Sequence, residues 1–285
     1  MFNTIKILVT GASGQLGQCI QKVEMNYEKF DFYFADSKEL NITKKGEIHD
    51  LFSNKQFDFV INCAAYTNVE QAEKNPKKAF EVNSEGVKNI AEVCKETNTT
   101  LIHISTDYVF DGQKKSPYTE EDIPNPINVY GKSKLMGEIF VQEILDEYFL
   151  IRTSWLYSEF GHNFFKSILK KSSVEEKLTV TISETGTPTN ANDLAKFILD
   201  LIGMNTLDYG VFHYSNLGEA TWFDFAKEIL KHSGKLDTIK LEKTDNYAIF
   251  ADRPKYSVLS KEKTVNIFKN SILDWSESFK KIKKG

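Results

Sequence analysis

Cysteine is scarce in this sequence, and its few copies are not arranged to cross-link the chain or to bind metal. The chain of 285 residues has three, Cys19, Cys63 and Cys94, with no ligand-like spacing between any two. None of the five histidines forms an H-x-x-x-H pair or lies near a pair of cysteines. This pattern argues against a disulfide framework, fits a reducing compartment and predicts no bound metal.

Long apolar runs and a large excess of one charge are also missing. The formal net charge is -4, from 36 Lys and Arg against 40 Asp and Glu. Binding to phosphate polymers or to anionic lipid needs a clear excess of basic residues, so we expect no nucleic-acid partner and no membrane partner. No apolar stretch approaches the roughly twenty residues of a membrane span. Because the chain also opens without an apolar signal region, we expect a cytoplasmic protein.

What the sequence does contain is an alternation of two patterns. Short runs rich in β-branched and aromatic residues predict strands at 5–10, 32–35, 57–62, 100–105 and 149–153. Longer segments between them, such as 79–94, carry apolar residues at helical spacing. Near-continuous apolar strands separated by helices indicate βαβ units. The expected fold is therefore α/β, with a doubly wound parallel sheet that binds ligands at the carboxyl ends of its strands.

A glycine-rich loop follows the first expected strand directly. It reads Gly11-Ala12-Ser13-Gly14-Gln15-Leu16-Gly17 and leads into a helix. Gly11 permits the tight turn, Gly14 lets the backbone approach a pyrophosphate, and Gly17 lets the helix pack close to the strand. Such a loop also serves as a plain turn. Its position at the start of a βαβ unit nevertheless favours dinucleotide binding on a Rossmann-type sheet.

The second half of the chain is less regular, and no linker rich in Gly, Ser or Pro separates it from the first. We expect a helix at 163–171, strands at 178–182 and 211–214, and helices after Pro188 and from Thr221 onward. We therefore assign residues 1–155 to a dinucleotide-binding Rossmann domain. Residues 156–285 would form mainly a smaller substrate-binding lobe, with some segments returning to the Rossmann core.

Residues after the second and third strands extend the expected cofactor site. Asp36 lies about twenty residues beyond the glycine loop, where a carboxylate can bind the adenosine ribose. This favours NADH, since a carboxylate repels a 2′-phosphate, although nearby Lys38 keeps NADPH open; a plain turn role for Asp36 is the alternative. Small residues in the segment 62–66 leave room for the cofactor. Asn83, on the next helix, would reach either a backbone group or the cofactor.

Tyr130 and Lys134 have the i, i+4 spacing that places two side chains on one face of a helix. We expect this helix to start near Asn128, after the breakers Pro124 and Pro126. An exposed surface pair is the alternative interpretation. The pair follows a long loop after the strand that ends in Ser105-Thr106-Asp107, close to where the glycine loop would place a nicotinamide. The spacing therefore predicts a catalytic pair.

The chemistry of ketone reduction explains why these residue types matter. Hydride goes to carbon, and a proton must reach the oxygen. A phenol has an unperturbed pKa of about 10, and a nearby ammonium favours the phenolate. We expect Tyr130 to donate the proton, and Lys134 to tune the pKa of Tyr130 and to hold the nicotinamide ribose. Thr106 would place a hydroxyl on the substrate oxygen.

With these residues in hand, the sequence resembles the extended short-chain dehydrogenase/reductase superfamily and, within it, the dTDP-4-dehydrorhamnose reductases. The resemblance runs over nearly the whole chain. Its motifs are Val9-Thr10-Gly11-Ala12-Ser13-Gly14-Gln15-Leu16-Gly17, Ile61-Asn62-Cys63-Ala64-Ala65-Tyr66-Thr67 with Val69 and Ala72-Glu73, His103-Ile104-Ser105-Thr106-Asp107-Tyr108-Val109-Phe110-Asp111-Gly112, Val129-Tyr130-Gly131-Lys132-Ser133-Lys134-Leu135, Arg152-Thr153-Ser154-Trp155, Gly186-Thr187-Pro188-Thr189 and Arg253-Pro254.

The resemblance implies NAD(P)H-dependent reduction of the 4-keto group of dTDP-4-dehydro-β-L-rhamnose to dTDP-β-L-rhamnose, the last step of dTDP-rhamnose biosynthesis. It makes Thr106, Tyr130 and Lys134 the catalytic set. Thr106, Asp107 and Trp155 match the positions that hold the sugar, and the flat face of a tryptophan suits the C–H surface of a deoxy sugar. The expected cofactor-binding residues are Gly11, Ser13, Gly14, Gln15, Leu16, Gly17, Asp36, Asn41, Ile42, Ala64, Ala65, Tyr66, Thr67, Asn83, Ile104, Tyr130 and Lys134.

One departure from the family pattern concerns metal and assembly. Some members carry a glutamate just after the glycine loop that helps to bind Mg²⁺ at a dimer contact. This chain has Gln18-Cys19 there, so we expect no bound metal. A metal-linked dimer loses its support, and a homodimer of another kind stays open.

Two other functions fit the same motifs. The first is a different NDP-4-keto-sugar reductase or an NDP-sugar epimerase, because these enzymes share the glycine loop and the Tyr/Lys pair. The second is a non-catalytic regulatory subunit on the same fold, like the β subunit of methionine adenosyltransferase. Intact Tyr130, Lys134 and Thr106 favour catalysis. The run 105–110 and Trp155 favour the rhamnose-type reductase, while the nucleotide base and the choice of NADH or NADPH stay open.

Overall fold

The structure is a computed structural model that describes residues 4–245, 250–269 and 271–282. Its centre is a six-stranded parallel sheet of order β10-β5-β4-β3-β1-β2. The strands are β1 (Ile5–Thr10), β2 (Phe30–Ala35), β3 (Phe59–Asn62), β4 (Thr100–Thr106), β5 (Tyr148–Thr153) and β10 (Gly210–His213). The order reverses between β1 and β3, which is where doubly wound sheets bind their ligands. The predicted Rossmann-type fold is confirmed.

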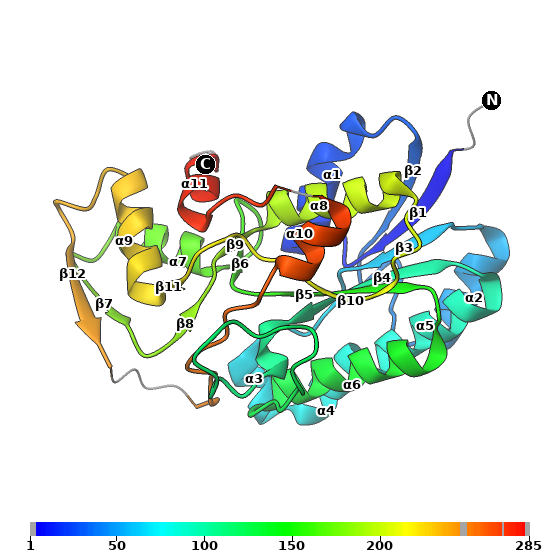
Figure 1. Cartoon of the computed structure of the whole chain (residues 1–285), viewed down its shortest axis with the longest axis horizontal. Helices are drawn as coiled ribbons and strands as arrows, with labels where there is room; N and C mark the ends of the chain where they lie inside the picture. The colour runs from blue at the N-terminus through cyan, green and yellow to red at the C-terminus, as the bar shows by residue number, and fades with distance from the viewer. Residues whose placement is uncertain (1–3, 246–249, 270, 283–285) are drawn as a thin grey trace.

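Helices cover both faces of this sheet (Figure 1). One face packs against α1 (Gln15–Val23), α8 (Ala191–Met204) and α10 (Glu262–Phe268), and the other against α2 (Lys45–Asn54), α5 (Gly86–Thr97) and α6 (Val129–Ile144). Strand β1 shows why its sequence is apolar throughout. Ile7 and Val9 join the first core, whereas Leu8 joins the second, because successive side chains of a strand point to opposite faces.

The connection from β3 to α5 is made of short helical pieces that pack beside α6. They are α3 (Val69–Lys74), α4 (Pro76–Phe80) and the π-helical turn Glu81–Glu85. Two glycines of α6 let it approach its neighbours: a Cβ at Gly137 would lie 2.2 Å from the Asn83 carbonyl oxygen, and one at Gly131 would lie 2.1 Å from the Tyr108 carbonyl oxygen. The glycines thus set the position of the helix that carries Tyr130 and Lys134.

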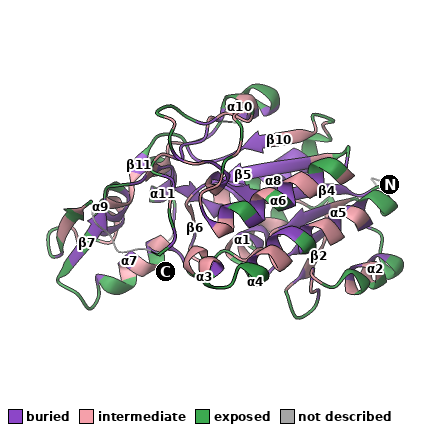
Figure 2. Ribbon diagram, turned by 90° about the horizontal axis from the view of Figure 1, so that it is seen from below, coloured by how far each residue is buried: buried purple, intermediate pink, exposed green. Residues whose placement is uncertain are grey.

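A second core lies beyond the carboxyl ends of the strands, around Tyr157, Phe165, Phe225 and Phe279. Its elements are β6 (Leu156–Tyr157), α7 (Phe164–Lys171), β7 (Lys177–Thr181), β8 (Thr185–Gly186), β9 (Thr189–Asn190), β11 (Ala220–Thr221), α9 (Trp222–His232), β12 (Lys240–Thr244) and α11 (Trp275–Lys280). In Figure 2 the strands of the main sheet are largely buried, and the outer surfaces of the helices are exposed. The division of function between 1–155 and 156–285 stays a prediction.

Most of the expected helix starts are found with the capping groups that explain them. Asn163 caps α7, and Thr221 caps α9 in a capping box with Asp224. Helix α8 begins at Ala191 with Asn190 as its cap, shortly after Pro188, where a helix was expected. Within the described part of the chain, no helix combines the length and the hydropathy that crossing a bilayer would require.

Candidate active site

A pocket of about 560 Å³ lies at the carboxyl ends of β1, β3, β4 and β5, where the Rossmann sheet meets the second core. Many residues predicted from the sequence line it. They are Gly14, Gln15, Leu16, Ala65, Thr67, Ile104, Thr106, Asp107, Tyr130, Lys134 and Trp155. The predicted catalytic set, part of the glycine loop and the predicted sugar-binding residues therefore share one cavity.

The glycine loop forms one wall of this pocket, and its shape depends on missing side chains. Gly11 has a φ of +64°, and a Cβ there would lie 2.6 Å from the Ala64 backbone nitrogen. A Cβ at Gly17 would lie 2.7 Å from the Cα of Ala12. Neither position has room for a larger residue, so the loop can lie flat between β1 and the segment after β3.

Helix α1 starts in the pocket wall with its first turn open to a ligand. Gly14 is its N-cap, no side chain caps the backbone N–H groups, and the first turn contains no acidic residue. Free N–H groups and the positive end of the helix dipole together favour an anion. This geometry fits the pyrophosphate of a dinucleotide, and the cofactor contacts of Gln15 and Leu16 stay predictions.

The segment 158–163 lies against the glycine loop from the other side. Asn163 Nδ2 donates to Gln15 Oε1 over 2.8 Å, and Ser158 Oγ donates to the same oxygen over 3.2 Å. Gly161 adopts a φ of +64°, and a Cβ there would press on the Gln15 side chain. The Gln15 side chain is thus held by hydrogen bonds at the pocket wall.

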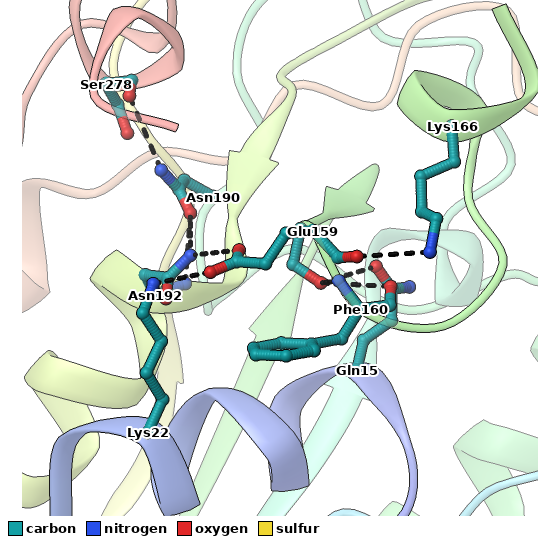
Figure 3. Close-up of polar contacts among 9 residues, drawn as sticks. Gln15, Lys22, Glu159, Phe160, Lys166, Asn190, Asn192 and Ser278 are labelled. Carbon is teal, nitrogen blue, oxygen red and sulfur yellow. Dashed lines mark hydrogen bonds and ion pairs between the residues drawn. The ribbon is translucent and has the colours of Figure 1, made fainter. Parts of the chain in front are cut away.

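Glu159 ties this segment to two helices, as Figure 3 shows. Its carboxylate accepts hydrogen bonds from Lys22 of α1 and from Asn192 of α8, the latter over 2.9 Å. Lys22 Nζ also lies 3.1 Å from Asn192 Oδ1. These contacts fix the segment 158–163 over the start of α1, so that this edge of the pocket is preorganised.

Tyr130 reaches the pocket because α6 starts where the sequence predicted. Asn128 is the N-cap, its Oδ1 accepts from the Gly131 backbone nitrogen over 2.7 Å, and its Nδ2 donates to the Asp252 carbonyl oxygen. The ring of Tyr130 meets that of Tyr108 edge to face, with centroids 5.8 Å apart. The helix start and this aromatic contact together orient the phenol.

The electrostatics of Tyr130 differ from the prediction that a lysine ammonium lowers its pKa. Burial raises the pKa of Tyr130 to about 12, while a hydrogen bond with Thr106 acts in the opposite direction. Burial outweighs the favourable contacts because the charged phenolate loses its hydration. The expected depression is therefore wrong for this structure, and Tyr130 holds its proton at neutral pH.

Lys134 is buried, with only 2% of its surface exposed. Its Nζ donates to the Ile104 carbonyl oxygen over 2.6 Å and lies 3.4 Å from His103 Nε2. Burial lowers the pKa of Lys134 to about 8, because few groups replace the hydration of the ammonium. This rules out the alternative of an exposed surface pair.

Thr106 and Asp107 lie at the end of β4, both nearly fully buried. The Thr106 hydroxyl donates to Asp107 Oδ1 over 3.0 Å, and Ser257 Oγ donates to Asp107 Oδ2 over 2.6 Å. Burial raises the pKa of Asp107 to about 7, although these hydrogen bonds favour the carboxylate. Within the described residues, no cluster of His, Cys, Asp and Glu is arranged to hold a metal ion.

Comparison with known proteins identifies the family of this chain. Residues 5–284 match the model of the RmlD substrate binding domain. The chain belongs to this family. It is 34% identical to a dTDP-4-dehydrorhamnose reductase of Aggregatibacter actinomycetemcomitans, over 98% of both chains. It is also 34% identical to a dTDP-4-keto-6-deoxy-D-glucose reductase of Streptomyces niveus, over 90% of this chain and 88% of that one.

A solved structure of the same family has the same fold over the full chain. A dTDP-4-dehydrorhamnose reductase of Bacillus anthracis, solved in complex with NADP, superposes with a TM-score of 0.93 at 36% identity and covers 98% of both chains. The family resemblance drawn from the motifs of the sequence is thereby confirmed.

The structure of the present chain adds two pocket residues that were not predicted from the sequence. Trp222, at the start of α9, stacks on Trp155 with ring centroids 3.6 Å apart. Arg253 also lines the pocket, pairs with Glu70 over 3.2 Å and leaves its buried Nε without a partner among the described residues. The motif Arg253-Pro254 was a signal for the arginine, whereas nothing local distinguished Trp222 from a core residue.

Several predicted cofactor residues lie outside the pocket lining. The backbone N–H groups of Lys38 and Glu39 donate to Asp36 Oδ1, which is the turn role, and its ribose contact stays a prediction. Asn83 is fully buried, and its side-chain amide makes two hydrogen bonds with the Tyr66 backbone. Asn83 Oδ1 accepts from the Tyr66 N–H over 2.7 Å, and Asn83 Nδ2 donates to the Tyr66 carbonyl oxygen over 3.0 Å. This is the backbone option for Asn83, and its cofactor contact stays a prediction.

The remaining predicted cofactor residues support the loop walls. Asn41 Oδ1 accepts from the backbone and hydroxyl of Thr43, and Ile42 is buried in the core behind α5. The Ser13 carbonyl oxygen accepts from Gln18 Nε2 over 2.7 Å. Ala64 and Tyr66 flank the pocket residue Ala65. Their contacts to a cofactor stay predictions.

Proposed function

We propose that this chain reduces the 4-keto group of dTDP-4-dehydro-β-L-rhamnose to dTDP-β-L-rhamnose, with NADPH or NADH as the reductant. The observation that carries the proposal is the shared pocket of Thr106, Tyr130 and Lys134 beside an uncapped helix N-terminus. Family membership over residues 5–284 and relatives named as dTDP-4-dehydrorhamnose reductases support the choice of substrate.

The side chains can supply each protein contribution to a carbonyl reduction. A bound nicotinamide supplies the hydride. Tyr130 presents its hydroxyl donor to the substrate oxygen, and Thr106, whose hydroxyl donates to Asp107 in this structure, would turn its O–H to the same oxygen and stabilise the charge that develops there. Tyr130 then gives up its proton, which its raised pKa keeps in place until the alkoxide forms. Lys134 lines the same pocket and would provide an N–H donor for the nicotinamide ribose.

The pocket also offers contacts to both ends of a nucleotide sugar. The stacked Trp155 and Trp222 give an apolar surface for the deoxy sugar, and Asp107 lies beside Thr106 to accept a sugar hydroxyl. Arg253 brings a guanidinium with an unpartnered Nε to the same lining. A guanidinium of this kind is suited to the negative charge of a diphosphate.

The pyrophosphate of the reductant would lie at the start of α1, against the backbone of Gly14, Gln15 and Leu16. The Bacillus anthracis relative was solved with NADP, which supports NADPH for this chain. Asp36 at the end of β2 keeps NADH in consideration, since its carboxylate suits an unmodified ribose.

A second reaction has an observation in its favour. The Streptomyces niveus relative is named a dTDP-4-keto-6-deoxy-D-glucose reductase, which acts on the same functional group of a different sugar. Steady-state assays with both dTDP-4-keto sugars and each cofactor separate the two. The proposal expects faster oxidation of NAD(P)H with the rhamnose-type substrate. Turnover without net oxidation of the cofactor would indicate an epimerase, and no turnover with either sugar would favour a regulatory role.

The proposed substrate is a small soluble molecule, so we place the reaction in the cytoplasm and retain a homodimer as the proposed assembly. Cell fractionation tests the location. Light scattering coupled to gel filtration tests the assembly, since a mass of one chain at micromolar concentration would reject the dimer.

A further inference from the structure

His103 is a buried titratable residue that the proposed chemistry does not use. It lies on β4, one residue before Ile104, and none of its surface is exposed. Its Nδ1 lies 3.1 Å from Asn62 Nδ2, and its Nε2 lies 3.4 Å from Lys134 Nζ. The imidazole therefore bridges β3 and the catalytic lysine of α6.

The orientation of the Asn62 amide determines which nitrogen of His103 carries a proton. Asn62 Oδ1 accepts from the Ala64 backbone nitrogen over 3.2 Å and from the Thr10 hydroxyl over 2.7 Å. A backbone N–H can only donate, so a flipped amide would set two donors against each other at Ala64. Asn62 therefore presents its Nδ2 donor to His103.

A donor facing Nδ1 leaves that nitrogen without a proton. A neutral imidazole then carries its proton on Nε2, since each tautomer has one donor and one acceptor nitrogen. The imidazolium is disfavoured because burial and the charge of Lys134 lower the pKa of His103 well below its usual value. The resulting N–H points from Nε2 toward Lys134.

The Nε2–H of His103 faces Lys134 Nζ, and an ammonium at that position cannot accept a hydrogen bond. The protonated amine has three donors and no lone pair, and the Ile104 carbonyl oxygen takes one donor over 2.6 Å. The neutral amine, by contrast, can accept from His103 Nε2 and still donate to Ile104. We propose that His103 is a positioning residue that, through its Nε2–H, holds the amine form of Lys134 and so makes the lysine release its proton more readily.

The other ionisable groups around Lys134 are Glu138, Cys63 and Tyr130. Glu138 and Cys63 raise the pKa of Lys134, but Glu138 is paired with Arg152 over 2.7 Å, and burial keeps the Cys63 thiol protonated. Tyr130 is also protonated at neutral pH. Burial, the largest effect, lowers the pKa of Lys134 to about 8.

This inference rests on the proposed function only for its effect on turnover, and its structural part can be tested alone. A long-range ¹H–¹⁵N spectrum of the full chain labelled in histidine reports the tautomer of each ring, with the His103→Phe variant assigning the signal. We expect the Nε2–H form of His103 throughout the neutral pH range. An Nδ1–H form or an imidazolium would overturn the proposal whatever reaction the protein performs.

The effect on Lys134 is tested with Asn62→Asp, which keeps the acceptor for Ala64 and removes the donor to His103. An aspartate forces the proton of His103 onto Nδ1 and turns Nε2 into an acceptor for an ammonium. We expect the alkaline limb of the kcat profile for NAD(P)H oxidation to move up by about one pH unit or more.

The double variant Asn62→Asp/His103→Phe separates the effect of the His103 tautomer on the pH profile from the effect of the added carboxylate. Relative to His103→Phe alone, we expect a clearly smaller upward shift, since no imidazole remains to carry the effect. An equal shift in both backgrounds, or none in Asn62→Asp, would contradict the role of His103. If no substrate is turned over, the spectrum still decides the tautomer.

Discussion

The indole rings of Trp155 and Trp222 stack face to face, with centroids 3.6 Å apart and planes within 4° of parallel. Trp155 has a φ of +45°, a strained conformation for a large residue, and a Cβ at Gly186 would lie 2.5 Å from its ring. Trp222 donates in turn to Glu184 Oε2 over 2.6 Å. The apolar surface predicted for the sugar therefore consists of two stacked tryptophans, one directly before β6 and one at the start of α9, and not of a single ring.

Trp222→Ala should weaken binding of the nucleotide sugar and leave cofactor binding nearly unchanged. The lost stacking corresponds to about 0.5–1.5 kcal/mol, so KM should rise by roughly 2- to 10-fold. Trp222→Phe keeps a ring on Trp155 and should show a smaller rise. Steady-state kinetics at saturating NADPH measure both variants. An unchanged KM in folded Trp222→Ala would remove the tryptophan from the substrate site.

Tyr130→Phe should reduce kcat by about 10²- to 10⁴-fold, since the change removes only the transferable proton. The dissociation constant for NADPH should stay close to that of the wild type. Tyr33→Phe, on β2 and away from the pocket, is the matched control. A wild-type rate in Tyr130→Phe would assign the proton donor to another group.

Gly11→Ala should impair the dinucleotide cradle. The new Cβ would lie 2.6 Å from the Ala64 nitrogen in a backbone with a φ of +64°. A fluorescence titration should show weaker NADPH binding, and unfolding in urea should show a loss of stability. Gly46→Ala is the matched control, because a Cβ there has no neighbour within 4 Å. Equal cofactor affinity in the two variants would argue against the assigned role of Gly11.

Glu138→Gln should destabilise the fold. Glu138 is fully buried and accepts from Arg152 Nη2 over 2.7 Å, and Arg152 is only 4% exposed. Removing the carboxylate leaves a buried guanidinium without its counter-charge, at a cost of about 3–5 kcal/mol in the free energy of unfolding. Glu143→Gln, at an exposed position of the same helix, should change it by no more than about 0.5 kcal/mol. Urea titrations that give both variants the same stability would contradict this.

Asp107 should make stability depend on pH. Its folded-state pKa is raised by burial to about 7, above the ordinary value of 3.8, so the folded protein holds this proton more tightly than the unfolded chain. The contribution is therefore present at low pH and is lost as the pH rises from about 4 to about 7, by at most about 1.4 kcal/mol per pH unit. Relative to the wild type, Asp107→Asn should gain stability across this range. A difference that is constant with pH would contradict the raised pKa.

Features that depend on local sequence could be predicted. The turn at Gly11, the helix start at Asn128 and the spacing of Tyr130 and Lys134 each need only a few neighbouring residues. The apolar strands also specify the parallel sheet, because burial on both faces leaves no polar alternation. The pocket of these residues then follows from the rule that such sheets bind ligands at their switch point.

Features that depend on distant packing could not be predicted in this way. Trp222 reaches the pocket only because α9 packs in the second core with its first residue on Trp155, and Arg253 does so because the segment before α10 returns to Asp107 and Glu70. The sequence left two partners open for Asn83, a backbone group or the cofactor, and only the packing shows that its amide bonds to the Tyr66 backbone. The pKa of Tyr130 could not be inferred from its distance along the helix to Lys134, since burial dominates it.

The most direct test of the proposed reduction is a single-turnover reaction with deuterated NADPH and dTDP-4-dehydrorhamnose, followed by mass spectrometry and NMR of the sugar. We predict one deuterium at C4 of the product for each cofactor oxidised, and almost none in the same time with Tyr130→Phe. Product without deuterium and with the cofactor unchanged, or equal transfer by Tyr130→Phe, would contradict it.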